Sequence, residues 1–304
     1  MSTASDGVRV LAVDIGGTKV ALAVVGEDGS VLTSDRFPTP RIDSRRAVAE
    51  ILERAATLAG PAHVAAGGIV LPAVVEEGRV AWAAESIAGW DGLPLARMAS
   101  EAVGVPFAVE FDGYGATLGE LWQGCARGYQ DAVIVIIGTG IGAGFVHNGQ
   151  LFRGRSGVAG GIGWFRCPRG DTLGPKLEEL AAGPAILAAA RELNPAAAYP
   201  DTEAVFSAAQ KGDPAAASVV QRALLALSAG IGSVVALLAP EIVVLGGSVG
   251  ARADVVDAVR RHLGGTTQPF AARSIRVESS ALGSLSSLYG AAYLALRLAS
   301  GKEP

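Results

Sequence analysis

Two apolar runs near the start of the chain have the composition of buried strands and are separated by a glycine turn. Val8–Val13 leads into Asp14–Lys19, with the sequence DIGGTK, and Val20–Val25 must then fold straight back on the first run. The two glycines leave backbone N–H groups unshielded and the threonine adds a hydroxyl donor, so the turn can receive a phosphate. An ordinary hairpin with a Gly-Gly turn is the alternative that this motif alone leaves open.

The same order of apolar run, glycine turn and apolar run returns in the second half of the chain. Ala132–Ile137 is followed by Gly138-Thr139-Gly140-Ile141-Gly142-Ala143-Gly144, and a third apolar run starting near Glu241 ends at Gly246-Gly247-Ser248. Three such junctions fit one nucleotide held in a cleft between two halves of the chain. The sequence contains no G-x-x-x-x-G-K-[ST] phosphate loop. The second cluster also fails as a dinucleotide fingerprint, because it continues as a strand where a helix is needed.

Between these junctions, segments of helical period alternate with apolar strands, which predicts an α/β protein. Helices are expected over 45–58, 93–103, 115–123, 177–193, 214–238 and 282–298, and further strands over 31–34, 64–71 and 106–110. The helix over 214–238 is apolar along most of its length, so we expect it to be deeply packed.

Composition narrows the classes of protein that fit. With 304 residues, half of them apolar and only 18% charged, the chain can build a large core and suits two domains. A net charge of −4 and no basic run longer than a pair such as Arg260-Arg261 disfavour nucleic-acid binding. Only Cys125 and Cys167 are present, which excludes a disulfide framework and a four-cysteine metal site. Because Met1–Gly7 is polar and the other apolar runs are interrupted, we expect a cytoplasmic protein with no signal peptide and no membrane span.

The order of these motifs resembles the ROK family of sugar kinases (repressor, open reading frame, kinase), within the actin-like ATPase superfamily. The resemblance runs from Val10 to about Leu298 and includes Pro240–Gly247 (PEIVVLGG) and Tyr289-Gly290-Ala291-Ala292. It implies two α/β domains of actin-like, ribonuclease H-like fold with an interdomain cleft, and a homodimer. On this pattern residues 1–112 and a final helix over about 291–304 form the first domain, and 113–290 the second. A repressor of the family would need a helix-turn-helix domain ahead of Val8, where we expect none.

The resemblance also assigns the catalytic and nucleotide-binding residues. Val109–Glu120 (VEFDGYGATLGE) is similar to the family's V-x-N-D-A-N-A-A-A-L-G-E stretch and makes Asp112 the general base that accepts the hydroxyl proton of the sugar. A helix N-cap is the alternative role for this aspartate. ATP phosphates would lie against Gly16, Gly17 and Thr18 and against Gly138, Thr139 and Gly140, with Gly246 and Gly247 on the adenosine side. Asp14 would reach Mg²⁺ through water, because this ion sheds its hydration shell reluctantly.

On the acceptor side the chain departs from the family pattern. The family's E-x-G-H sugar motif aligns on Gly161-Ile162-Gly163-Trp164, so Gly161 stands at the glutamate position and Trp164 at the histidine position. Phe111 replaces the asparagine before the base. Glu178 keeps the register of the family's C-L-E-x-x-x-S-G-P-A-I to within one residue, and we expect it to contact a ligand hydroxyl. Its neighbour Glu179 fits an exposed helix surface instead.

The family's zinc segment, C-x-C-G-x-x-G-C, is also missing. Cys167-Pro168-Arg169-Gly170 is its only trace, and Trp164 stands where the histidine of that site would be. Because a single thiol cannot hold tetrahedral zinc, we expect a zinc-free protein.

Losing a glutamate, a histidine and an asparagine together would weaken a glucose site by roughly several kcal/mol. Together with these departures, the resemblance implies an ATP-dependent kinase that phosphorylates an exocyclic hydroxymethyl group of a modified hexose, such as an amino sugar, or of a C7 cyclitol. Tyr114 and Arg166 are candidate new contacts to that acceptor. A conventional glucokinase and a catalytically idle sugar- or nucleotide-binding regulatory protein are the alternatives, and polyphosphate is a second possible donor.

Overall fold

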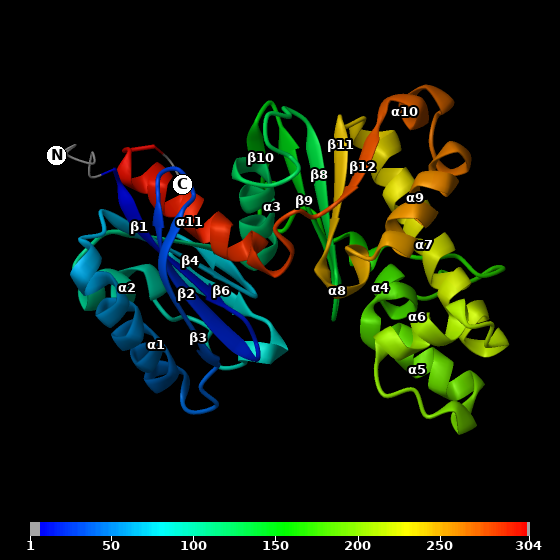
Figure 1. The fold of residues 1–304 in the computed structure, drawn as a ribbon, viewed down its shortest axis with the longest axis horizontal. Coiled ribbons are helices and arrows are strands. Elements are labelled where there is room, and N and C mark those ends of the chain that lie inside the picture. The colour runs from blue at the N-terminus through cyan, green and yellow to red at the C-terminus, as the bar shows by residue number, and fades with distance from the viewer. Residues whose placement is uncertain (1–6, 303–304) are drawn as a thin grey trace. The chain divides into compact units, whose positions relative to one another are not determined.

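The computed structural model describes residues 7–302, which form two compact units (Figure 1). Within the described residues, unit 1 comprises 7–127, Gly154–Val158 and 284–302, and unit 2 comprises Gly128–Arg153 and Ala159–Gly283. The chain thus leaves unit 1 after Arg127, later than the division after residue 112 that the family pattern implies. Of the polar segment used to predict the absence of a signal peptide, residues 1–6 lie outside the described part of the chain.

The sheet of unit 1 has five strands in the order β3-β2-β1-β4-β7. The strands are β1 (Arg9–Ile15), β2 (Lys19–Gly26), β3 (Val31–Pro38), β4 (Ala66–Leu71) and β7 (Phe107–Phe111). The first three form an antiparallel meander, and β4 and β7 run parallel to β1. The predicted hairpin around the Gly-Gly turn is therefore confirmed. A separate hairpin, which the sequence analysis missed, pairs β5 (Ala73–Glu76) with β6 (Arg79–Ala83).

Helices cover both faces of this sheet (Figure 1). The bounds are Ser44–Ala59 for α1, Leu95–Val103 for α2, Asp112–Trp122 for α3 and Ser286–Ala299 for α11. The predicted apolar face of α1 is buried and packs with α2 on the side chains of β1 and β4 that include Leu11, Val13 and Ile69. The alternate residues face the other way, so α11 lies against Gly68, where an added Cβ would overlap the backbone of Ala291.

Helices α3 and α11 cross at small residues. A Cβ atom on Gly119 would overlap the carbonyl oxygen of Ser286, and one on Gly290 would overlap that of Gly115. Both helices thus place small residues four positions apart at the contact, Gly115 with Gly119 and Ser286 with Gly290, which lets the backbones approach closely. There is no space at this crossing for even one additional methyl group.

The sheet of unit 2 repeats the strand order of unit 1, as β10-β9-β8-β11-β12. The strands are β8 (Ala132–Ile137), β9 (Ile141–His147), β10 (Gln150–Phe152), β11 (Ile242–Gly246) and β12 (Arg276–Ser279). Again three strands form an antiparallel meander, and the other two run parallel to the first. The predicted repeat of apolar strand, glycine turn and apolar strand is confirmed, since both units carry the same topology.

The core of unit 2 lies between its sheet and a helical layer. The helices are α4 (Leu177–Ala181), α5 (Gly183–Leu193), α6 (Thr202–Gln210), α7 (Pro214–Leu238), α8 (Gly247–Gly250), α9 (Ala253–Thr266) and α10 (Pro269–Ser274). By length and composition α7 could cross a membrane, but 56% of its apolar window is buried inside the structure, as in the core helix of a globular protein. The single helix predicted over 177–193 is wrong, because the chain becomes extended at Ala182 and a new helix starts at Gly183-Pro184.

Short 3-10 turns connect the longer elements of both units. They span Gly60–Ala62, Glu85–Ile87, Ile162–Trp164, Pro195–Ala197 and Gly283–Leu285. The turn over Ile162–Trp164, with Gly161 at its N-cap, holds the positions that align with the family's acceptor motif.

Candidate functional site

The glycine turn between β1 and β2 is closed and held from outside. The Gly16 N–H donates to the Lys19 carbonyl at 2.9 Å, so that amide is used by the turn, and the amides of Gly17 and Thr18 lie outside this bond. Thr39 donates through its hydroxyl to the Gly16 carbonyl at 2.6 Å, and the Arg41 guanidinium donates to the Gly17 carbonyl at 2.9 Å. The carbonyl groups of Gly16 and Gly17 are therefore engaged by side chains of the protein, and the N–H groups of Gly17 and Thr18 are candidates to bind an anion.

Sequence reasoning missed the residues that support this turn. Thr39 and Arg41 come from the segment after β3, and Ser86 from the 3-10 turn after β6. A Cβ on Gly17 would lie 2.5 Å from the Ser86 Cβ, so Gly17 has no space for a side chain. No local pattern marks these three residues, because each belongs to a loop that is far from the turn in sequence.

Asp112 is the first residue of α3, directly after the end of β7. The N-cap position belongs to Phe111, which makes no side-chain capping bond, so Asp112 is not the N-cap residue considered as its alternative role. Burial raises the pKa of Asp112 to about 6, and hydrogen bonds from backbone N–H groups of Gly113 and Asp112 itself oppose that rise. A carboxyl group with this pKa is ionised at neutral pH and can accept a proton.

Asp14 lies on the same edge of the sheet as Asp112. It is the last residue but one of β1 and lies opposite Val70 of the parallel strand β4, and Val70 lies opposite Glu110 of β7. Burial and the charge of Asp112 together raise the pKa of Asp14 to about 7, while Lys19 and Arg36 act to lower it. Open α/β sheets bind their ligands at this carboxyl edge of the parallel strands.

The pair of carboxyl groups suits a divalent cation. Two negative charges held near each other and partly withdrawn from water are costly unless a cation or a proton offsets them. Among the residues that the structure describes, no group of three or more His, Cys, Asp and Glu side chains could hold a metal. Asp14 therefore fits an ion that keeps waters and phosphate oxygens as its other ligands, which is how Mg²⁺ is usually bound.

Phe111 and Tyr114 pack on each other on either side of Asp112 in the sequence. Their ring centroids are 5.4 Å apart with the planes at 87°, an edge-on contact. Tyr114 is only 1% exposed, so its side chain belongs to the interior of unit 1 and does not fit the ligand contact considered for it. Phe111 is half-buried and presents apolar surface where the family has an amide.

In unit 2, the glycine clusters meet at the carboxyl edge of β8 and β11. Gly246 ends β11 beside Ile136 of the parallel strand β8, and Gly138 follows the end of β8. Gly247 has φ +81°, and a Cβ there would overlap the Ile137 carbonyl, so only glycine fits this turn. Thr139 and Gly140 are exposed beyond the strand. These glycines form a second edge at which backbone amides can approach a phosphate or a nucleoside.

The two glutamates at the start of α4 separate as predicted. Glu179 is exposed, and its carboxylate accepts the Lys176 N–H at 2.9 Å, the bond that the N3 residue makes in a capping box. Glu178 is half-buried, and a Cβ built on Gly163 would lie 3.0 Å from its Oε2 atom, while one on Gly140 would lie 3.6 Å away. Glu178 thus joins the exposed end of the Gly138 cluster to the 3-10 turn that carries Trp164.

Trp164 is 65% exposed, and one face of its ring is covered. The Lys176 ammonium group lies 3.3 Å from the ring centroid, a close cation–π contact. The Phe165 carbonyl accepts the Leu177 N–H at 2.8 Å, and Arg166 pairs with Lys176 in an isolated antiparallel bridge. Because this ladder joins the two ends of the loop, Trp164 is held beside Lys176 and Glu178 by backbone hydrogen bonds.

The remainder of this loop replaces the family's zinc segment by a hairpin. Cys167 N–H donates to the Pro175 carbonyl at 2.9 Å, and Arg169 pairs with Thr172 around the turn. The Cys167 side chain packs on the core of unit 2, and burial raises the pKa of its thiol. Arg166 donates to the Gly174 carbonyl at 3.1 Å and so braces the hairpin, which leaves its predicted acceptor contact without geometric support.

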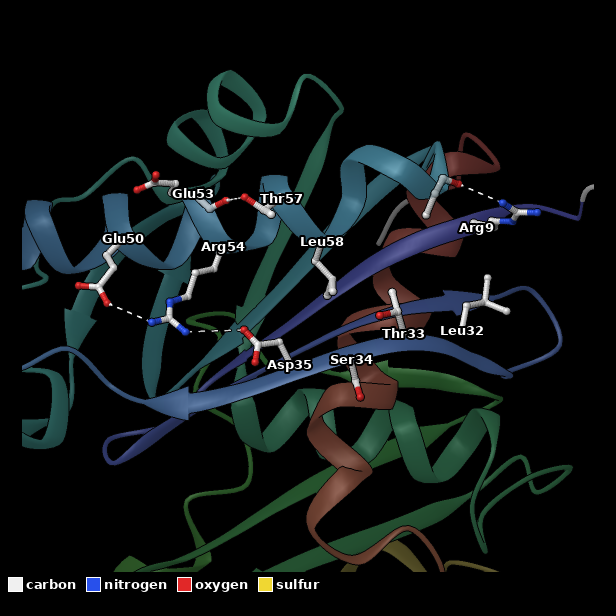
Figure 2. A pocket seen from close by; sticks show the side chains of 11 residues that line it. Arg9, Leu32, Thr33, Ser34, Asp35, Glu50, Glu53, Arg54, Thr57 and Leu58 are labelled. Carbon is white, nitrogen blue, oxygen red and sulfur yellow. Dashed lines mark hydrogen bonds and ion pairs between the residues drawn. The ribbon is translucent and has the colours of Figure 1, made fainter.

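A surface pocket of about 850 Å³ lies elsewhere on unit 1, between β3 and α1 (Figure 2). Arg54 crosses it, 3.7 Å from the Asp35 carboxylate and 3.9 Å from that of Glu50. None of the predicted site residues line this pocket. Arg54, Asp35 and Glu50 pair with one another there.

Comparison with known proteins gives a consistent picture. A model of the ROK family matches residues 10–298. N-acetylmannosamine kinase of Escherichia fergusonii is 32% identical over 262 residues, which cover 83% of this chain and 87% of that protein. Glucokinase of Streptomyces coelicolor is 30% identical over 315 residues, covering 94% and 96%. A solved ROK family glucokinase from Streptomyces griseus, in complex with glucose and AMPPNP, superposes with a TM-score of 0.77 at 30% identity, covering 95% of this chain and 99% of that one.

Proposed function

Because the chain belongs to the ROK family and is a carbohydrate kinase like its relatives, we propose that it transfers the γ-phosphoryl group of ATP to an exocyclic hydroxymethyl group of a modified hexose or C7 cyclitol. An amino sugar is the favoured modified hexose. The relatives include both an N-acetylmannosamine kinase and a glucokinase, so the family relationship supports a sugar kinase and leaves the acceptor to be argued from the site.

Asp112 is the proposed general base. The acceptor oxygen attacks the γ-phosphorus, the bond between that phosphorus and the β,γ-bridging oxygen breaks, ADP leaves, and the hydroxyl proton passes to the Asp112 carboxylate. The buried position at the start of α3 supports this role, because its pKa of about 6 keeps the group ionised at pH 7 while making it a stronger base than an exposed aspartate.

The phosphates of ATP are proposed to meet backbone amides in both units. In unit 1 the turn of Gly16, Gly17 and Thr18 would supply the N–H groups of Gly17 and Thr18, because that of Gly16 donates to the Lys19 carbonyl. In unit 2 the turn of Gly138, Thr139 and Gly140 would supply those of Thr139 and Gly140, because that of Gly138 donates to the Gly140 carbonyl. The adenosine part of ATP would lie against Gly246 and Gly247, where the backbone packs closely on β8. Asp14 would hold Mg²⁺ through water, and this ion would supply charge compensation to the transferring phosphate.

The acceptor is proposed to carry fewer or altered hydroxyl groups on one edge of its ring. Gly161 and Trp164 stand where the family has a glutamate and a histidine, so two strong hydroxyl partners are missing there. Glu178 can hold one or two ring substituents, including an ammonium group. The ring face of Trp164 that Lys176 leaves uncovered offers a platform for the apolar face of a ring or for an acetyl methyl group. The replacement of the family's glutamate and histidine by Gly161 and Trp164 is the observation that favours a modified acceptor over glucose.

The test is kcat/KM at saturating ATP across glucose, mannose, amino hexoses, N-acetylated hexoses and C7 cyclitols. The proposal expects a modified hexose or a cyclitol to give the highest value. If glucose does so, within the range of about 10⁴–10⁸ M⁻¹s⁻¹ usual for enzymes, the chain is a conventional glucokinase. If no acceptor is phosphorylated although ligands bind, the idle regulatory alternative holds. Running the same panel with polyphosphate in place of ATP tests the donor.

We further propose that the enzyme is a cytoplasmic homodimer. The family relationship and the mostly buried apolar window of α7 support a protein that works without a membrane. Multi-angle light scattering on the purified full chain tests the dimer, and fractionation of the producing cells tests the location.

A further inference from the structure

Unit 1 contains a buried glutamate, Glu120, that has no role in the proposed catalysis or ligand binding. Glu120, near the end of α3, has no exposed surface. Its Oε1 atom accepts the Ser286 hydroxyl at 2.8 Å, and its Oε2 atom accepts the Cys125 N–H at 3.0 Å. Burying a carboxyl group is costly unless its oxygens are hydrogen-bonded, so a residue of this kind indicates a constraint on the structure around it.

Those two partners mark the points where the chain leaves and finally re-enters unit 1. Cys125 comes just before the chain leaves after Arg127, and Ser286 comes just after it returns at Ser284. The Glu120 carbonyl also accepts the N–H groups of Gly124 and Ala126, at 3.2 and 3.0 Å. One residue thus fastens both connections to the end of α3.

The same helices carry the constraint to the base. The Ser287 hydroxyl donates to the carbonyl oxygen of Asp112 at 3.3 Å, so the first turn of α11 contacts the start of α3 as well as its end. Between these two contacts the helices cross at Gly119 and Gly290, where there is no space for a methyl group. A shift of α3 along α11 would therefore move Asp112 and break the bonds of Glu120 together.

We infer that Glu120 is a positioning residue for Asp112: by binding the Ser286 hydroxyl and the Cys125 amide it fixes α3 on α11 and so fixes the site of the base. The inference rests on the proposed role of Asp112. It adds a residue that does not contact acceptor or nucleotide and acts through the backbone of α3. Misplacing a reacting group by about 1 Å can cost on the order of 10²-fold in rate, so the effect belongs in kcat.

The chemistry of the two oxygens supplies a conservative variant. In Glu120→Gln the amide oxygen can still accept the Cys125 N–H, and the amide NH₂ can donate to Ser286, whose hydroxyl can act as an acceptor. Both contacts survive. Glu120→Ala removes both, and Ser286→Ala removes one. Ser228→Ala is the matched control, because Ser228 is equally buried but lies in unit 2, where its hydroxyl donates to the Leu224 carbonyl at 2.7 Å.

The experiment compares kcat, acceptor KM and melting temperature of these four variants of the full chain, with the best acceptor from the panel. Glu120→Ala should lower kcat at least about tenfold and change KM less than about threefold, and Ser286→Ala should lower kcat about three- to tenfold. Glu120→Gln should stay within about twofold of wild type. Ser228→Ala should lower the melting temperature and leave kcat unchanged.

A second readout does not depend on turnover. The chemical shift of the Asp112 carboxyl carbon is followed by NMR as a function of pH in metal-free buffer, in wild type and in the Glu120 and Ser286 variants. Burial raises the pKa of Asp112, so a displacement of α3 that exposes this carboxyl group to water should lower its titration midpoint. We expect this lower midpoint in Glu120→Ala and not in Glu120→Gln. An inactive wild type would refute the proposed function and leave this readout intact. The inference is overturned if folded Glu120→Ala keeps wild-type kcat and midpoint, or if Glu120→Gln is as impaired as Glu120→Ala. Ser286→Ala decides the matter if Glu120→Ala does not fold.

Discussion

Asp14 and Asp112 stand at the carboxyl ends of two strands of one sheet, and the charge of Asp112 adds to burial in raising the pKa of Asp14 to about 7. Two carboxyl groups that disfavour each other's ionisation are a poor arrangement for stability. They are a good one for phosphoryl transfer, where a base and a cation ligand are needed close to the same phosphate.

Asp112→Asn should abolish most of the activity while leaving nucleotide affinity near that of wild type. The amide keeps the size of the side chain but cannot accept the hydroxyl proton, so kcat should fall by about 10²–10⁴-fold. Calorimetry gives the nucleotide affinity and a coupled ADP assay gives kcat. Retention of more than about a tenth of the activity would remove Asp112 from the role of base.

The pH dependence of kcat should follow the ionisation of Asp112. The base must be unprotonated to act, and burial raises its pKa to about 6, so kcat should rise with pH through about 6 and then level off. Initial rates from pH 4.5 to 8.5 with saturating substrates measure the midpoint. A kcat that is already level across this range, as expected if the pKa stays near its usual value of 3.8, would show that the carboxyl group is hydrated in the working enzyme.

Asp112→Asn should also stabilise the protein at neutral pH. The folded protein holds the Asp112 proton up to about pH 6, whereas the unfolded chain releases it near 3.8, so the folded state binds more protons between these values. The contribution of this group to the free energy of unfolding therefore falls as pH rises from about 4 to 6 and stays low above. Removing the charge should raise that free energy by about 1–3 kcal/mol at pH 8.

Urea unfolding at pH 4 and pH 8 measures this effect, with Asp171→Asn as the control because Asp171 is exposed on the hairpin of unit 2. The gain should be present at pH 8, shrink toward pH 4 and be absent in the control. Equal gains for Asp112→Asn at both pH values would point to packing and not to charge.

Restoring the family's acceptor pair should restore a preference for glucose. A Cβ on Gly161 meets only the Trp164 Cδ1 atom, at 3.9 Å, and Gly161 has φ −69°, so Gly161→Glu fits the backbone. Combined with Trp164→His it should raise kcat/KM for glucose, relative to the best modified acceptor, by about tenfold or more. Phe270→His, on the exposed surface of α10, is the control and should leave the ratio unchanged. An unaltered ratio in the double variant would show that other residues choose the acceptor.

Phosphoryl transfer should require Mg²⁺ and no zinc. Asp14 fits an ion that keeps most of its water, and the loop that holds zinc in the family carries a single cysteine here, Cys167. Activity after dialysis against EDTA should return with Mg²⁺ alone. Stoichiometric zinc in protein purified without added metal, measured by elemental analysis, would contradict this.

The parts of the molecule that local patterns encode could be predicted, and those that depend on distant loops could not. Both glycine meanders and the burial of Glu178 relative to Glu179 follow from spacing and register. The break before α5 was missed although Gly183-Pro184 marks it, because the apolar period continues across the break. Thr39, Arg41 and the bond between Glu120 and Ser286 carry no local signal, since each joins segments that only the fold brings together.

The contact between α3 and α11 has a consequence for biosynthesis. The two helices are separated in the chain by the whole of unit 2, whose residues are almost continuous, so on the ribosome unit 2 can close while unit 1 still lacks its last helix. Domains generally fold as units as they emerge. Here the earlier unit finishes last, and an interrupted translation product that ends before Ser286 would carry every proposed catalytic and ligand-binding residue without the support that holds Asp112 in place. Full activity would then be expected only in a product whose synthesis includes α11.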